Sequence, residues 1–134
     1  MTPIAAPLIP AHWSRIWALI EPAVMRGGEH TERSVLTGLL HGGFVLWSDA
    51  EDIAAARAFV VTAWCDYPAG RIGFVQFAGG SGADAWLADA IADFSAWAKA
   101  MGCKELRVVG RKGWARQLKR APTDFTYRET LSAE

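Results

Sequence analysis

The sequence has few of the residues that build metal centres and disulfide frameworks. Its 134 residues include two cysteines, Cys65 and Cys103, and three histidines. The cysteines form no CxxC pair and the histidines show no ligand spacing, so no metal site is expected. A disulfide between the two cysteines stays open, but two buried free thiols fit the sequence better. Free thiols are typical of a reducing, cytoplasmic compartment, and this is the location we expect.

The chain also lacks a long apolar run and an excess of charge of either sign. No apolar stretch approaches the roughly 20 residues that span a bilayer. Residues 1–10 contain three prolines and no basic start, unlike a signal peptide. The 14 basic and 14 acidic residues balance to a net charge of zero, and no motif of a nucleic-acid-binding module is present. We therefore expect neither a membrane nor a nucleic acid as partner.

Hydrophobic and aromatic residues are abundant. They make up 51% of the chain and include seven tryptophans. This is enough apolar side chain for one packed domain over residues 1–134, with most of the tryptophans in its core. Tryptophan is also enriched at protein interfaces, so a protein partner or a homodimer stays open.

The most informative stretch runs from Arg71 to Val109. The pattern predicts a strand over Arg71–Phe77, a glycine-rich turn over Ala78–Ala83, a helix over 84–101 and a second strand over 104–109. Asp84 is the expected N-cap of the helix, and Gly102 the residue that ends it. One apolar stripe at steps of three and four marks its buried face: Leu87, Ala90, Ile91, Phe94, Trp97, Ala98 and Met101.

The remaining segments predict an α/β (α+β) fold with a mixed, mostly antiparallel sheet of five to six strands flanked by helices. The expected element order is α-α-β-β-β-α-β-α-β, preceded by an extended, proline-broken arm over residues 1–10. The helices outside the central stretch are expected over 11–25, 31–41 and 114–120, and the strands over 44–47, 58–65 and 125–131.

Several short motifs, in this order along the chain, resemble the GNAT acyltransferase superfamily. Within it, the chain is similar to small GNAT-like proteins encoded in prophage and related gene clusters. The matching residues are Leu46-Trp47, Gly79-Gly80, Trp86-Leu87, Trp97 with Gly102-Cys103, and Gly110–Trp114 with Leu118.

The resemblance implies an acyl-CoA such as acetyl-CoA as cosubstrate and an amine as acceptor. In the superfamily, the strand before the long helix splays from the strand after it, and the pantetheine arm lies in that gap. The pyrophosphate binds backbone N–H groups of the turn, although Ser81 departs from the small residue expected there. A helix-entry loop without a ligand stays open, because the Asp84 carboxylate would repel a phosphate. The positions carried over are Phe77, Gly79, Gly80, Ser81, Gly82 and Ala83, with Arg111 and Lys112 for the outer phosphate.

Catalytic residues are harder to place. The superfamily often uses a carboxylate on the strand before the turn and a tyrosine near the helix after the fifth strand. Arg71–Phe77 contains no Asp or Glu, and Trp114 stands near the tyrosine position, which leaves Tyr127 as the candidate acid. Two hypotheses follow: an acyl-CoA-dependent N-acyltransferase, or a non-catalytic, phage-related module for binding or assembly. The three histidines flank predicted helices, where we expect surface positions.

Overall fold

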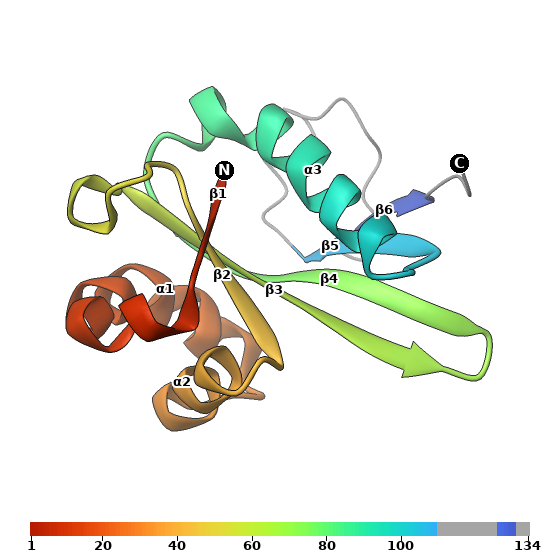
Figure 1. Cartoon of the computed structure of the whole chain (residues 1–134), viewed down its shortest axis with the longest axis horizontal. Helices are drawn as coiled ribbons and strands as arrows, with labels where there is room; N and C mark the ends of the chain where they lie inside the picture. The colour runs from red at the N-terminus through yellow and green to blue at the C-terminus, as the bar shows by residue number, and fades with distance from the viewer. Residues whose placement is uncertain (110–125, 131–134) are drawn as a thin grey trace.

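A single six-stranded sheet organises the part of the chain that the structure describes, residues 1–109 and 126–130 of a computed structural model (Figure 1). The strands are β1 (Thr2–Ile4), β2 (Phe44–Ser48), β3 (Ala58–Tyr67), β4 (Gly70–Gly80), β5 (Glu105–Val109) and β6 (Thr126–Thr130). The helices are α1 (Trp13–Gly27), α2 (Glu32–Leu40) and α3 (Ala83–Ala100).

The strands lie side by side in chain order, from β1 to β6. Neighbours pair antiparallel, except that β4 and β5 are parallel and are joined by α3. A parallel pair needs such a crossover because the chain must return to the starting end of the sheet. The predicted α+β class, with a mixed and mostly antiparallel sheet, is therefore confirmed.

The beginning of the chain adds a short strand to the sheet. Within the extended arm expected over residues 1–10, Thr2–Ile4 forms β1 and pairs antiparallel with β2, with Ile4 opposite Leu46. Two short 3₁₀ turns then lead into α1. Only Ile4 of this strand is buried, at 8% exposure, and three residues are too few for an alternating pattern to show in the sequence. The helix expected over 114–120 lies outside the described residues.

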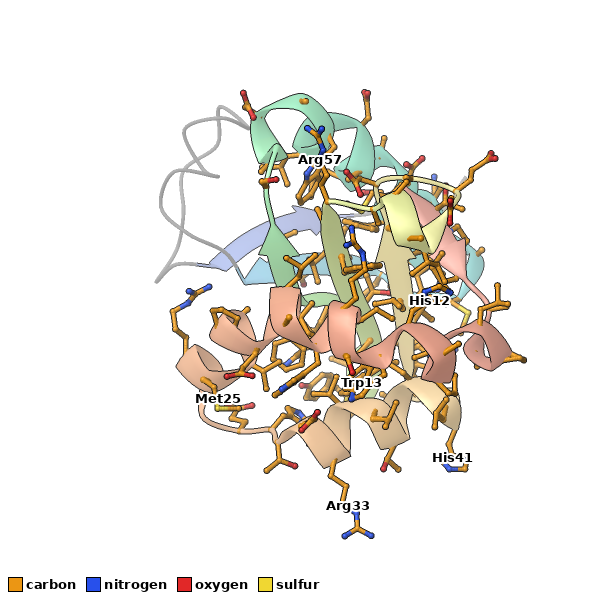
Figure 2. All side chains as sticks on the ribbon, turned by 90° about the vertical axis from the view of Figure 1, so that its left-hand side faces the viewer. His12, Trp13, Met25, Arg33, His41 and Arg57 are labelled. Atoms are coloured by element: carbon orange, nitrogen blue, oxygen red, sulfur yellow. The ribbon has the colours of Figure 1, made fainter. Side chains whose placement is uncertain are left out.

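The helices cover the two faces of the sheet. Helices α1 and α2 lie against one face and α3 against the other (Figure 1). The two core clusters follow this division, one packed under α1 and α2 and one under α3. Trp13 links the first two helices, because its indole Nε1 donates to Glu32 Oε1 at 3.2 Å (Figure 2).

The apolar stripe of α3 is confirmed. Leu87, Ala90, Ile91, Phe94 and Ala98 are buried, and Trp97 and Met101 pack at the margin of the same cluster. Gly102 follows with φ of 80°, as expected of a glycine that ends a helix. Leu40, the last residue of α2, is 37% exposed.

The two cysteines are both free, but only one is buried. Cys103 lies in the α3 core, as expected. Cys65 is exposed because β3 runs on past β2, whose last pair joins Phe44 to Ala63. Trp64, just beyond that pair, is also 36% exposed. The expectation of two buried thiols is therefore wrong for Cys65.

Candidate functional site

Strand β5 pairs with only the first half of β4. Their parallel pairing runs from Ile72 opposite Glu105 to Val75 opposite Val108 and then stops. Strand β4 continues to Gly80, paired with β3 alone among the described strands. The end of this pairing coincides with a β-bulge, which leaves Gln76 without a register partner on β3. A bulge adds a residue to one strand and bends it, so β4 bends just beyond its last pair with β5.

The glycine-rich segment is mostly strand. The expected strand ended at Phe77, but β4 reaches Gly80, with Gly79 opposite Phe59 on β3. Only Ser81 and Gly82 separate the strand from α3. The expected six-residue turn over Ala78–Ala83 is therefore wrong in extent.

Close backbone contacts explain two of the glycines. A Cβ on Gly79 would lie 1.7 Å from the carbonyl oxygen of Leu19 on α1. A Cβ on Gly80 would lie 2.1 Å from the carbonyl oxygen of Arg57, and Gly80 also has φ of +111°. Real Cβ atoms do not approach backbone this closely. Glycine at both positions is thus required by the packing of α1 and β3 against β4, and a larger residue at Gly80 would disturb the fold.

The start of α3 also differs from the expectation. The N-cap is Gly82, in the left-handed conformation with φ of 80°, and Asp84 is the second residue of the helix. Asp84 therefore does not cap the helix, because Ala83 before it is already helical. Its carboxylate still lies in the first turn, where it interacts favourably with the helix dipole.

Ser81 is held by backbone hydrogen bonds. Its N–H donates to the Arg57 carbonyl at 3.1 Å, and its carbonyl accepts from Trp86 Nε1 at 3.1 Å. A phosphate at this turn would consequently not accept a hydrogen bond from the Ser81 N–H. The Ala85 N–H is also engaged, since it donates to the Gly82 carbonyl at 2.8 Å, so the donors to consider here are the N–H groups of Gly82 and Asp84.

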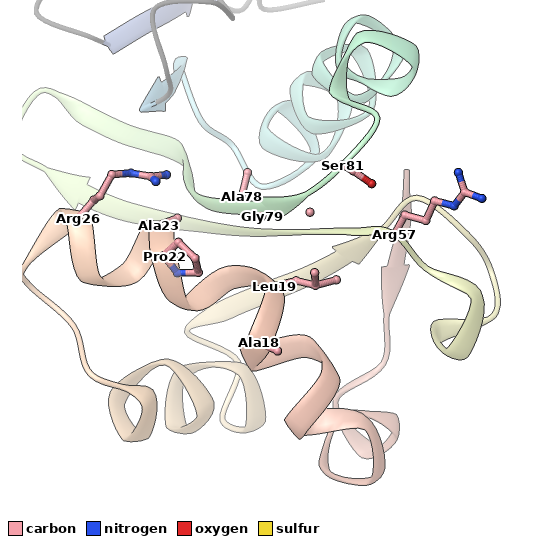
Figure 3. A pocket seen from close by; sticks show the side chains of 10 residues that line it. Ala18, Leu19, Pro22, Ala23, Arg26, Arg57, Ala78, Gly79 and Ser81 are labelled. Atoms are coloured by element: carbon pink, nitrogen blue, oxygen red, sulfur yellow. The ribbon is translucent and has the colours of Figure 1, made fainter.

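A groove of about 320 Å³ lies between α1 and the end of β4 (Figure 3). It borders the segment of β4 that lies beyond the last pair with β5. Its walls combine one face of α1, the end of β4 and the residue before β3. The lining residues are Ala18, Leu19, Pro22, Ala23, Arg26, Arg57, Ala78, Gly79, Gly80 and Ser81.

Three of the residues carried over from the sequence line this groove: Gly79, Gly80 and Ser81. The α1 residues and Arg57 were missed. The available signal was the small side chains of Ala18 and Ala23, which lie beside the apolar stripe of α1 and leave room next to the sheet.

The other carried-over residues are placed differently. The Phe77 ring is only 4% exposed and lies in the α1/α2 core, so only its backbone is near the groove. Tyr127 belongs to β6, where its backbone pairs with Val108. Arg111 and Lys112 lie outside the described residues.

Two of the histidines, His12 and His30, are partly buried, and His41 is exposed. His30 is half-buried between α1 and α2, with its ring centroid 5.5 Å from Phe44 and 5.7 Å from Phe77. Its Nδ1 lies 3.1 Å from Ser34 Oγ. His30 is therefore partly exposed, with its ring packed edge-on against these two aromatic rings. His30 does not line the groove.

The charged side chains in the described lining of the groove are all positive. Arg26 and Arg57 are its charged residues, and no carboxylate, histidine or tyrosine accompanies them. No group of three or more metal-ligating side chains occurs among the described residues. The groove is therefore suited to bind an anion with an apolar part, and its described walls supply no general base.

Comparisons with known proteins do not name a family. No family model matches the chain, and no curated protein matches it. None of the helices in 1–109 has the length and apolar character needed to cross a bilayer.

Proposed function

We propose that this protein is an acyl-CoA-dependent N-acyltransferase of the GNAT type. The observation that carries the proposal is the edge of β4 beyond Val75, which pairs with no described strand on the β5 side and lies next to a groove that ends at the start of α3. An extended amide chain such as pantetheine can add to a strand edge of this kind through backbone hydrogen bonds. Arg57 and the N-terminus of α3 would meet the pyrophosphate at the end of the groove.

In this reaction the amine nitrogen attacks the thioester carbonyl carbon. The C–N bond forms, the C–S bond breaks, and coenzyme A leaves as the thiol with the proton that the amine gives up. A backbone N–H of β4 would polarise the carbonyl, and the groove would hold the thioester in position. The described lining offers no base, so the amine would enter neutral or lose its proton to water.

A second candidate is a non-catalytic module that binds a ligand or a protein partner. The observation that favours it is the same absence of a carboxylate, histidine or tyrosine along the described groove. Acyl transfer between bound reactants can proceed through positioning alone, and for this reason we place the enzyme first.

Isothermal titration with acetyl-CoA tests the site. Ala18 is exposed on α1 and lines the groove, so Ala18→Phe should fill the groove without altering the core. Ala96→Phe, exposed on α3 and not among the residues of the groove, is the matched control. We expect acetyl-CoA to bind wild type and Ala96→Phe and to fail with Ala18→Phe.

Thiol release from acetyl-CoA in the presence of a panel of primary amines tests the chemistry. Release that depends on the amine supports the transferase. Binding without release between pH 6 and 9 would favour the second candidate. Equal binding to all three proteins would place the ligand elsewhere, and no binding at millimolar acetyl-CoA would end the proposal.

A further inference from the structure

The two arginines of the groove lie at its opposite ends (Figure 3). Neither guanidinium has a hydrogen bond or ion pair within the described residues. In contrast, Arg71 is paired with Asp66 and Arg107 with Glu105. Two unpaired cations at the ends of one groove indicate a ligand with negative charge in two places.

The positions of the arginines along β4 can be read from the backbone. Arg57 is level with the end of β4, because Ala58 pairs with Gly80. Arg26 lies toward Phe77, because a Cβ on the adjacent Gly27 would lie 3.9 Å from the Phe77 ring. Phe77 precedes Gly80 by three strand residues, or about 10 Å along β4. The walls between them are apolar: Leu19, Pro22, Ala23 and Ala78.

This arrangement gives the two ends different roles. A pyrophosphate at the start of α3 occupies Arg57, and the pantetheine arm then runs toward the level of the β4 bulge. Arg26 lies toward this inner end, where the acyl group and the acceptor meet. Coenzyme A itself carries no charge at that end, so the arm does not account for Arg26.

We propose that Arg26 binds a carboxylate carried by one of the two reacting partners. This inference rests on the proposed function and narrows its substrate class. The carboxylate belongs either to an amino-acid acceptor or to a dicarboxylic acyl group, and the chemistry that Arg26 recognises is the same. A guanidinium binds a carboxylate through two parallel N–H···O bonds, which a lysine cannot reproduce.

Two matched pairs of probes separate the sources. For the acceptor, the twenty amino acids are compared with their amides, with acetyl-CoA as donor and thiol release as readout. For the acyl group, binding of succinyl-CoA is compared with butyryl-CoA, which has the same chain length and no terminal charge. We expect wild type to prefer the carboxylate member of one pair by about 10-fold to 100-fold, as for hydrogen bonds to charged groups.

Variants of Arg26 then assign the preference. Arg26→Gln should abolish the preference for the carboxylate member, with a much smaller effect on the neutral member of the same pair. Arg26→Lys should restore only part of the preference. Arg33→Gln, on the outer side of α2 and pointing to solvent (Figure 2), is the control and should keep the preference intact.

The outcomes distinguish this inference from the proposed function. If acetyl-CoA binds but neither pair shows a preference, or Arg26→Gln leaves the preference in place, the inference is overturned and the transferase stands. Equal losses for charged and neutral probes would mean that Arg26 is structural, which also overturns it. If acetyl-CoA does not bind wild type, the proposed function fails and this inference fails with it.

Discussion

At the scale of single residues, the glycines between β4 and α3 are explained by backbone packing rather than by ligand binding. The run Gly79-Gly80-Ser81-Gly82 suggests an anion-binding turn from sequence. In the structure, two of its glycines let α1 and β3 approach β4, and Gly82 supplies the left-handed start of α3. Sequence shows that a Cβ is missing, but not what lies beside it. The contact partners, Leu19 and Arg57, are 60 and 23 positions away in the chain.

Gly79→Ala tests this close approach. The new Cβ would lie 1.7 Å from the Leu19 carbonyl oxygen, so α1 must shift from the sheet. We expect a loss of about 3 kcal/mol or more in the free energy of unfolding, the upper end for overpacking. Gly43→Ala, whose Cβ would meet only ordinary contacts from 3.8 Å, should change it by less than about 1 kcal/mol. Urea denaturation measures both, and equal effects would mean that α1 does not lie on Gly79.

The cysteines give a second residue-scale prediction. Cys65 is exposed, whereas Cys103 is buried and its burial raises the pKa of the thiol. Because the thiolate is the reactive form, iodoacetamide should modify Cys65 at least about tenfold faster than Cys103 in the folded protein. Peptide mass spectrometry over time measures the two rates. Cys65→Ser should retain only the slow reaction, and urea should remove the difference. Equal rates in the folded protein would contradict the burial of Cys103.

At the scale of elements, long periodic segments were predictable and short or irregular ones were not. The apolar stripe of α3 repeats over five turns. The helix, its buried face and the glycine that ends it can therefore all be predicted from the sequence. Strand β1 has three residues and one buried side chain, which is too little for a period. The end of β4 was missed because glycine has low strand propensity, which tertiary pairing with β3 overrides.

The β3–β4 hairpin carries a prediction about pH. The Arg71 guanidinium hydrogen-bonds Asp66 at 2.7 Å and also donates to the Met101 carbonyl, and its hydrogen bond lowers the pKa of the Asp66 carboxyl. A lowered folded-state pKa means that the pair stabilises the hairpin above the ordinary aspartate pKa and loses this effect as pH falls through the lowered value. Stability should therefore depend on pH on the acid side.

NMR titration of the Asp66 carboxyl measures this coupling. Arg71→Gln should return its pKa to the ordinary range near 3.9. Arg33→Gln, which removes a distant positive charge from α2, should leave the Asp66 pKa as in wild type. Asp66→Asn should make the loss of stability in acid shallower. An Asp66 pKa that does not move in Arg71→Gln would show that the pair does not persist in solution.

At the scale of the whole molecule, the candidate site exists only after the elements assemble. The groove needs α1 packed against the end of β4, with the residue before β3 beside them. The glycine-rich motif predicted the β4 residues of this site. Nothing in the sequence around Arg26 or Arg57 predicts that they line it. Each is an ordinary arginine, one at a helix end and one before a strand, until the fold brings them to the same groove.

At Asp84 the fold gives one carboxylate two opposite effects, on folding stability and on anion binding. Its carboxylate stabilises the first turn of α3, yet repels a phosphate bound there. Asp84→Asn should therefore lower the free energy of unfolding by about 0.3–1 kcal/mol and strengthen acetyl-CoA binding by about twofold to fivefold, the same energy with opposite sign. Denaturation without ligand and titration calorimetry at low salt measure the two effects. Asp89→Asn, exposed in the middle of α3, should change neither. A loss of stability with unchanged acetyl-CoA affinity would show that the phosphates bind away from the start of α3, and the groove would then have to be occupied in another orientation.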